Sequence, residues 1–236
     1  MKKELILFLH VPKTAGTSLA HSFRDAYAHS PSSLFIRGDG RDIGSPTRNK
    51  EIATRLVSKF NNSAEDCTIC YFDHMYYGVH YHLPDDIDYK YICFVREPIS
   101  RVISDYLYVH RTKEHILYPS ISMMTIEQCI GSGIYKNAMS NLMTRYLSGK
   151  AGGEIEEPDL LAAKENLSNF AYVGRQENFH QCFKEMQDAG LLRHDTKAYR
   201  EKFYVGAKPQ VAYSTYNHLK ALNHFDIQLY DWVCNK

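Results

Sequence analysis

The stretch FLHVPKTAGTSLAHSF, residues 8–23, decides the fold. An apolar run ends at His10, a short turn containing Pro, Lys and Gly follows, and apolar residues then resume at helical spacing. This order predicts a buried strand at 4–10, a tight turn, and a helix at 17–28. The start of a helix presents backbone N–H groups without intrahelical partners, together with the positive end of the helix dipole. The turn is therefore a candidate binding site for phosphate or sulfate.

Several residues of this turn suit an anion. Gly16 would let the backbone come close, Thr17 and Ser18 would add hydroxyl donors, and Lys13 would reach over the turn as a point charge. The backbone amides that would hold the anion belong to Thr14, Ala15, Gly16, Thr17 and Ser18. The nucleotide triphosphatase motif is excluded, because it needs Lys after its second Gly, and Lys13 precedes the only Gly of the turn by three positions. An ordinary strand, turn and helix with a surface lysine is the alternative.

The rest of the chain alternates predicted strands and helices. Strands are expected at 67–73, 89–95, 170–174 and 202–206, and helices at 50–60, 98–111, 124–131, 134–147, after Pro158, at 178–189 and at 214–233. This alternation predicts a single domain, residues 1–236, with a three-layer, P-loop-type α/β fold and a mostly parallel central sheet flanked by helices. The polar segments 30–49 and 112–125 are the expected substrate-recognising loops.

Charge and cysteine content exclude some functions. The chain has 28 basic and 27 acidic residues and a formal charge of +1, so no strong field directs it to nucleic acid or to an anionic membrane. The apolar run Leu5–Leu9 is too short for a signal peptide or a membrane span, and we expect a soluble, cytoplasmic protein. Cys67 and Cys70 form a CxxC in an apolar run, which favours buried thiols over zinc or redox chemistry. No pattern indicates an oligomeric state.

A second signature is YKYICFVREPISRVISDYLY, residues 89–108. Its apolar strand ends at Arg96, a Glu-Pro turn follows, and the next helix carries Ser104. Ligands of open α/β sheets bind at the carboxyl ends of the strands, where both Arg96 and Lys13 would lie. Arg96 offers phosphate a forked donor and Ser104 offers a hydroxyl group. Taken alone, Arg96 could also simply cap the edge of the sheet.

The segment YFDHMYYGVHYHLP, residues 71–84, supplies candidate bases. It begins within a predicted strand, so His74 should lie at the same edge as Lys13 and Arg96. The ordinary pKa of histidine suits a general base at neutral pH. His80 is the alternative base or a substrate contact, and purely structural roles are also open. A metal site built from His80, His82 and Asp73 is geometrically conceivable.

The PKTAGTS turn resembles the 5′-phosphosulfate loop of the sulfotransferases, in particular the branch with the heparan sulfate and uronyl 2-O-sulfotransferases and their bacterial relatives. In this family the 3′-phosphate loop has a strand-terminal Arg followed eight positions later by Ser, as Arg96 and Ser104 are here. His74, Gly78 and His80 are in register with the family's G-H-x-x-x-G-x-H segment, whose first His is taken as the base. Asp73 stands where the family usually has Gly, and its effect on the base is open.

Two further segments are similar to elements of the family. NLMTRYLSG, residues 141–149, makes Arg145 a candidate contact for a bound anion or an acidic acceptor, although an amphipathic helix with one exposed Arg would look the same. YVGRQENF, residues 172–179, resembles the V-G-x-x-E element, where Glu177 would order the site or simply serve as a helix-start carboxylate.

The resemblance implies an O-sulfotransferase that uses 3′-phosphoadenosine 5′-phosphosulfate (PAPS), needs no metal, and acts on a carbohydrate or a glycoconjugate. Lys13 would stabilise the departing phosphate oxygen, and the amides of Thr14 to Ser18 would hold the 5′-phosphate. Arg96 and Ser104 would hold the 3′-phosphate, and His74 would take the proton. A P-loop kinase would require Mg²⁺ ligands and a Lys after Gly. A non-catalytic PAPS- or glycan-binding protein would not require the base.

Overall fold

A parallel β-sheet forms the centre of the chain. The computed structural model describes residues 3–28, 32–40, 45, 47–63, 66–199 and 211–236. Within them, five strands are paired in the order β2-β3-β1-β4-β5, and every pairing is parallel. The strands are β1 (Lys3–Leu9), β2 (Ser33–Arg37), β3 (Cys67–Asp73), β4 (Ile87–Val95) and β5 (Tyr172–Arg175). The expected mostly parallel sheet is thus confirmed, and every described pairing obeys it.

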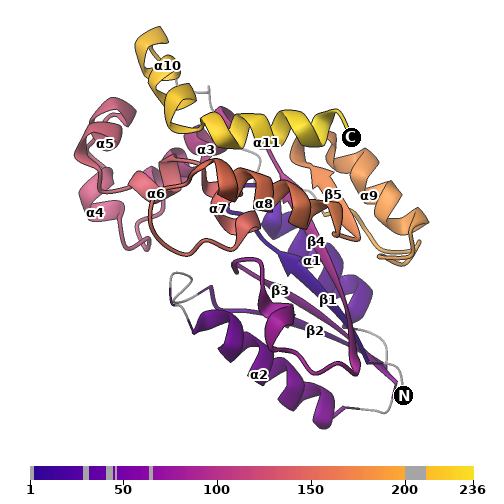
Figure 1. Cartoon of the computed structure of the whole chain (residues 1–236). Coiled ribbons are helices and arrows are strands. Elements are labelled where there is room, and N and C mark those ends of the chain that lie inside the picture. The colour runs from indigo at the N-terminus through magenta and orange to yellow at the C-terminus, as the bar shows by residue number, and fades with distance from the viewer. Residues whose placement is uncertain (1–2, 29–31, 41–44, 46, 64–65, 200–210) are drawn as a thin grey trace.

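Helices cover both faces of this sheet (Figure 1). Both faces carry apolar side chains, because successive side chains of a strand point to opposite faces. In β1, Leu5, Leu7 and Leu9 pack on one face, and Ile6 and Phe8 pack on the other. The leucine face is covered by α2 (Arg48–Asn61), α7 (Leu142–Ser148), α8 (Glu157–Ser168) and α11 (His224–Cys234). The opposite face is covered by α1 (Gly16–Tyr27) and α9 (Phe179–Asp188). The result is the predicted three-layer α/β architecture.

A third apolar core lies beside the sheet, around helix α3 (Pro98–Arg111). We call the helices that pack there the helical lobe: α4 (Tyr118–Ile121), α5 (Ile126–Ser132), α6 (Lys136–Met139) and α10 (Tyr213–Leu222). Figure 1 shows α4, α5 and α10 projecting away from the sheet. Two short 3₁₀ helices complete the order, η1 (Val79–His82) and η2 (Gln176–Asn178). Among the described residues, no helix has the length and apolar character needed to cross a membrane.

Five expectations about elements need correction or lie outside the described residues. Strand β2 occupies 33–37, inside the segment 30–49 that was expected to be a loop, and α4 occupies part of 112–125. The helices predicted at 134–147 and 214–233 are each divided in two, into α6 and α7 and into α10 and α11. The strand predicted at 202–206 falls outside the described residues.

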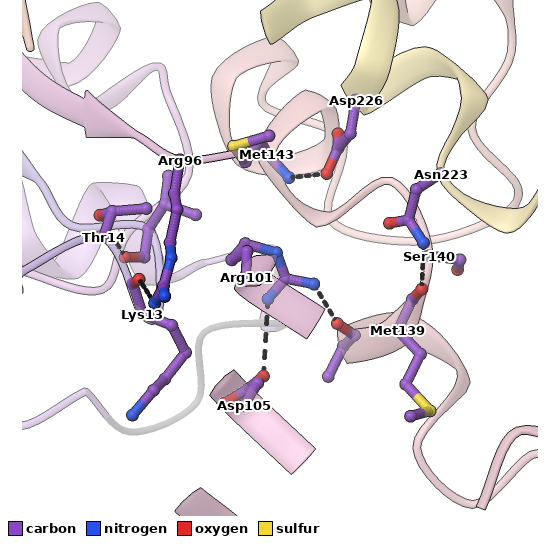
Figure 2. Close-up of polar contacts among 12 residues, drawn as sticks. Lys13, Thr14, Arg96, Arg101, Asp105, Met139, Ser140, Met143, Asn223 and Asp226 are labelled. Carbon is purple, nitrogen blue, oxygen red and sulfur yellow. Dashed lines mark hydrogen bonds and ion pairs between the residues drawn. The ribbon is translucent and has the colours of Figure 1, made fainter. Parts of the chain in front are cut away.

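The two divisions have a shared physical cause. Asn141, with φ of 45°, leaves the helical region just before α7, and its side-chain oxygen accepts the N–H groups of Phe225 and Asp226 at the start of α11. In return, the Asp226 carboxylate accepts the N–H groups of Met143 and Thr144 at the start of α7 (Figure 2). The residues at the start of each helix therefore cap the N-terminus of the other. Each helix break creates a new N-terminus whose N–H groups can accept such a cap.

Candidate active site

The strand register brings the predicted site residues to one edge of the sheet. Leu9, the last residue of β1, pairs with Asp73 on one side and with Cys93 on the other. Because all three strands are parallel, the residues that follow them emerge at the same edge. His10 and His74 are level there, and Arg96 follows the end of β4 nearby. The edge is the carboxyl edge, as expected for a ligand site of this fold class.

In the β1–α1 turn, the residues in the left-handed conformation are not glycines. Lys13 (φ 71°) and Ala15 (φ 69°) adopt the left-handed conformation, which costs about 1–2 kcal/mol for a residue with a side chain. Gly16 is instead the first residue of α1. A Cβ atom at this position would lie 1.7 Å from Nε2 of His10. Gly16 therefore makes room for the ring of His10, and the turn itself is made by non-glycine residues.

Three side chains hold carbonyl groups of this turn. Thr14 Oγ1 donates to the Val11 carbonyl at 2.8 Å, and Arg96 Nη1 donates to the Lys13 carbonyl at 3.1 Å (Figure 2). His74 Nδ1 lies 2.8 Å from the His10 carbonyl. The N-cap residue of α1 is Ala15, which offers no side-chain cap, and the first turn of the helix contains no acidic residue. This helix start keeps the positive end of its dipole without a built-in carboxylate, which suits an anion.

The turn that follows Arg96 is fixed by Glu97, by Glu177 and by the C-terminal helix α11. The Glu97 carboxylate caps α3 by accepting the Ile99 and Ser100 N–H groups at 3.0 and 2.7 Å. Glu177 accepts the Glu97 N–H at 2.9 Å, and the Tyr230 hydroxyl donates to Glu177 at 3.0 Å. The predicted ordering role of Glu177 thus has a geometric basis, because its carboxylate holds the turn directly after Arg96.

Lys13 also contacts the side of α3 that bears Ser104. Its Nζ lies 4.0 Å from the ring centroid of Tyr108, a cation–π contact. Ser104 precedes Tyr108 by one helical turn, so the two side chains lie on the same side of α3. Ser104 is partly buried, and Arg96 lies just before the same helix. The turn, Arg96 and this side of α3 therefore face a common region.

The protonation state of the His74 ring follows from its contact with His10. A carbonyl oxygen can only accept a hydrogen bond, so Nδ1 of His74 carries the proton, and the neutral ring has its lone pair on Nε2. Desolvation lowers the pKa of His74, while the hydrogen bond to His10 and the charges of Asp73 and Asp105 partly oppose this effect. The ring of His10 stacks on His74 with centroids 4.1 Å apart. The His74 ring is thus oriented and neutral at neutral pH.

Asp73, which departs from the family pattern, fixes the backbone at the end of β3. Its carboxylate accepts the Tyr71 hydroxyl and the Arg48 guanidinium, each at 2.7 Å. It also accepts the backbone N–H groups of Gly40 at 3.0 Å and of His74 at 2.8 Å. The carboxylate thus bonds to the main chain of His74. Asp73 therefore holds the backbone of His74, and its charge also favours the protonated ring.

His80 lies elsewhere. Its Nδ1 contacts the Tyr91 hydroxyl at 3.2 Å, and its ring packs against Tyr81 and Tyr89. It borders a recess of about 500 Å³ that includes Glu4 and Lys90, which lie near the amino ends of β1 and β4. The structure therefore does not bring His80 to the edge where His74 lies.

The structure also does not bring together the three residues of the metal interpretation, His80, His82 and Asp73. His80 and His82 belong to a 3₁₀ helix and not to a strand face, while Asp73 is bound to Arg48 at the other end of the sheet. Within the part of the chain that the structure describes, no group of three or more His, Cys, Asp or Glu residues is placed to hold a metal ion.

Arg145 is buried, with 3% of its surface exposed, so the picture of an amphipathic helix with one exposed Arg is wrong. Its guanidinium donates to the carbonyl oxygens of Lys150 at 3.3 Å and Gly153 at 2.8 Å. These bonds hold the turn after α7, and a role toward an anion stays a prediction. Cys67 and Cys70 lie buried on β3, which confirms the interpretation as buried thiols.

Several residues of this edge were not identified from the sequence. They include His10, which stacks on the base, Arg48, which pairs with Asp73, and Tyr108, which contacts Lys13. One signal was present in the sequence, because β1 and β3 are both followed directly by His, in Leu9-His10 and Asp73-His74. When two neighbouring parallel strands end level and each is followed by His, the two imidazole rings lie side by side.

Comparisons with known proteins agree with this geometry. The model of the sulfotransferase family matches residues 1–232. A search of curated proteins gave no match. Among solved structures, the chain is similar to the crystal structure of a fungal RNA kinase, with 15% identity, coverage of 94% of this chain and 98% of that chain, and a TM-score of 0.35. That score is too low to bear on function. Because the family match spans nearly the whole chain, the protein belongs to the sulfotransferase family and is a sulfuryl-transferring enzyme.

Proposed function

We propose that this enzyme takes its sulfuryl group from PAPS and transfers it to a hydroxyl group of a carbohydrate or a glycoconjugate. Membership of the family implies a sulfuryl donor, and PAPS carries two separate anionic groups, a 5′-phosphosulfate and a 3′-phosphate. The observation that carries the proposal is the presence of two cationic positions beside one oriented base. The two cationic positions are Lys13, just before α1, and Arg96, just after β4. The oriented base is His74, which directly follows β3.

The donor-binding residues follow from the contacts of the turn. The amides of residues 14–18 and the Lys13 ammonium would hold the 5′-phosphosulfate, because the N-cap residue Ala15 offers no capping side chain and the first turn of α1 has no acidic residue. Arg96 and Ser104 would hold the 3′-phosphate. The guanidinium of Arg96 uses Nη1 for the Lys13 carbonyl, and it has further N–H groups for a phosphate. Glu177 acts as a positioning residue for this second site through the Glu97 amide.

The chemistry of the residues suits sulfuryl transfer. When bound, PAPS supplies a sulfuryl group for in-line displacement by a hydroxyl oxygen. His74 accepts the hydroxyl proton at Nε2, since Nδ1 already donates to the His10 carbonyl. Its lowered pKa keeps the ring neutral and ready at neutral pH. Lys13 places a positive charge where negative charge develops on the leaving oxygen, which lowers the barrier more than it strengthens ground-state binding.

The carbohydrate acceptor is supported by the resemblance of residues 71–84 to the family's 2-O-sulfotransferase branch. Within that segment, His74 lies at the carboxyl edge and His80 lies near the amino edge. We therefore assign the acceptor hydroxyl to the surroundings of His74 and leave His80 and Arg145 outside the reacting site.

Calorimetry tests the donor. Adenosine 3′,5′-bisphosphate should bind at least about tenfold more tightly than 5′-AMP or ATP, because only it can occupy both anion positions, and a charge-assisted hydrogen bond contributes about 1.5–3 kcal/mol. Mg²⁺ should make no difference. Equal affinity for ATP, or a requirement for Mg²⁺, would instead support a P-loop kinase.

Transfer assays test the acceptor. Radiolabelled PAPS is incubated with a panel of desulfated glycans and with simple phenols and alcohols, and His74→Ala serves as the control. Transfer of label to one or more glycans, lost in His74→Ala, is the expected result. Transfer to phenols or alcohols with none to any glycan would contradict the carbohydrate acceptor while leaving the donor assignment in place.

A further inference from the structure

The ring of His10 lies between the proposed base and the anion-binding turn. It stacks on His74 with a centroid separation of 4.1 Å and an angle of 25° between the planes. It also packs against Phe72, with centroids 5.2 Å apart, and it adjoins the first residue of α1. A Cβ atom on Gly16 would lie 1.7 to 2.3 Å from Nε2, Cε1 and Cδ2 of the ring. The ring thus fills the space between His74 and the start of α1.

The main chain of His10 is tied to the same strand end. Its N–H donates to the Asp73 carbonyl at 2.9 Å, and its carbonyl accepts from Nδ1 of His74 at 2.8 Å. His10 therefore meets the base by its main chain and by its ring. Gly16 has no side chain, so the flat ring of His10 is the group that separates His74 from the start of α1. The thickness of this ring therefore limits how closely His74 can approach the helix.

We infer that His10 is a positioning residue for sulfuryl transfer, whose ring sets the spacing between the base and the phosphosulfate-binding turn. The inference rests on the proposed role of His74 and adds a residue to that site. It also explains Gly16: the position excludes a side chain because the ring of His10 occupies its place.

The charges around the pair are compatible with this role. Desolvation, followed by the charges of His74, Arg37 and Lys13, lowers the pKa of His10 well below its ordinary value. His10 therefore stays neutral and adds no repulsion when His74 takes up a proton. Around His74, the carboxylates of Asp73 and Asp105 favour the charged ring, and Arg37 opposes it.

Nuclear magnetic resonance of ¹⁵N-histidine-labelled protein tests the contact without relying on turnover. The signals of His74 are identified by their loss in His74→Gln. In the unmodified protein we expect the Nδ1–H tautomer and a pKa below the ordinary value. In His10→Ala, water replaces the ring and relieves the desolvation of His74, so the His74 pKa should rise toward the ordinary value of about 6.5. His10→Phe keeps a flat ring and should keep the low pKa.

His194→Ala is the matched control, because His194 is exposed and lies far along the chain from the site. It should leave the His74 signals unchanged. An unchanged His74 pKa in His10→Ala would overturn the inference. This readout is independent of the base assignment: if His74→Ala retains turnover, the proposed role of His74 as base fails, while the NMR result still decides whether His10 shields His74.

A double-mutant cycle tests the spacing. His10→Ala and Gly16→Ala should each lower kcat by about 10- to 100-fold, because a misplacement of the order of 1 Å can cost about 10²-fold. In the double variant the clash partner of the new Cβ atom is gone, so the loss should not exceed that of His10→Ala alone. Additive losses would contradict the spacing role. His10→Phe should retain most of kcat, which separates the ring from general effects of substitution.

Discussion

Replacing Arg48 with Ala should destabilise the protein strongly, because it leaves a buried carboxylate without its cation. Arg48 is the first residue of α2, and its Nη2 donates to Asp73 at 2.7 Å and to Asp39 at 2.9 Å. The Asp73 side chain is 1% exposed, and that of Arg48 is 12% exposed. Solvent therefore cannot replace the guanidinium fully once it is removed.

The size of the effect follows from the contacts that remain. Breaking a buried ion pair by removing one partner costs about 3–5 kcal/mol. Asp73 would keep three donors, the Tyr71 hydroxyl and the amides of Gly40 and His74, so we expect the lower end. For a chain of this size a loss of about 3 kcal/mol corresponds to a decrease in Tm of roughly 6–12 °C.

Urea titration and calorimetric melting measure this loss, with Arg55→Ala as the control. Arg55 is exposed on the same helix, so its replacement should change the free energy of unfolding by less than about 0.5 kcal/mol. Adding Asp73→Asn to Arg48→Ala should recover part of the loss, because no uncompensated charge is then buried. If Arg48→Ala costs no more than Arg55→Ala, the pair does not hold the end of β3 and the reasoning is refuted.

Three further predictions concern turnover. Lys13→Ala should lower kcat by about 10²–10³-fold, as loss of a preorganised donor does, and steady-state kinetics that show only a raised KM would contradict this. His74→Ala should lower kcat by about 10²–10⁴-fold with donor affinity nearly intact. Since the pKa of His74 is lowered, activity should fall only as pH drops below about 6.5, and a pH profile should show this acid limb lost in His74→Ala. Tyr108→Ala should cost up to about fivefold in kcat/KM, whereas Tyr108→Phe should cost little, because the cation–π contact with Lys13 is worth about 0.5–1 kcal/mol.

The elements that local signals define could be predicted well from the sequence. The strand at 67–73 and the helix at 98–111 match β3 and α3, since an apolar run bounds the first and Pro98 sits in the first turn of the second. Strand β2 was not predicted because it has one buried residue, Ile36, and, among the described strands, pairs with β3 alone, so it lacks the alternation of a core strand. The helix breaks at Asn141 and Asn223 depend on bonds between segments about eighty residues apart, which no local pattern shows.

The same distinction holds for the site. That Lys13, His74 and Arg96 share an edge could be predicted, because each follows a parallel strand. The neighbour that Gly16 makes room for could not be inferred, because only the fold places the His10 ring beside it. The partner of Asp73 could not be inferred either. Arg48 begins a different element, α2, and only the packing of that helix on the sheet brings it to Asp73.

The geometry of one peptide group separates the two proposed phosphate sites. In a trans peptide the carbonyl and the following N–H point in opposite directions. The Lys13 carbonyl faces Arg96, so the Thr14 N–H points away from Arg96. An anion held by the Thr14 amide and an anion held by Arg96 therefore lie on opposite sides of this peptide.

A donor with two phosphate groups can use both sides, and a nucleotide with only a 5′-phosphate can use one. Arg96→Ala should therefore weaken adenosine 3′,5′-bisphosphate by the value of a charge-assisted hydrogen bond, about 1.5–3 kcal/mol, or roughly 10- to 150-fold. It should change the affinity for 5′-AMP by less than about threefold, because the only contribution it can lose is the bond to the Lys13 carbonyl, worth about 0.5 kcal/mol when partly exposed. Calorimetry with both ligands measures the two effects side by side. Equal losses for the two nucleotides would mean that Arg96 acts only by holding the turn, and the 3′-phosphate would then have to bind elsewhere.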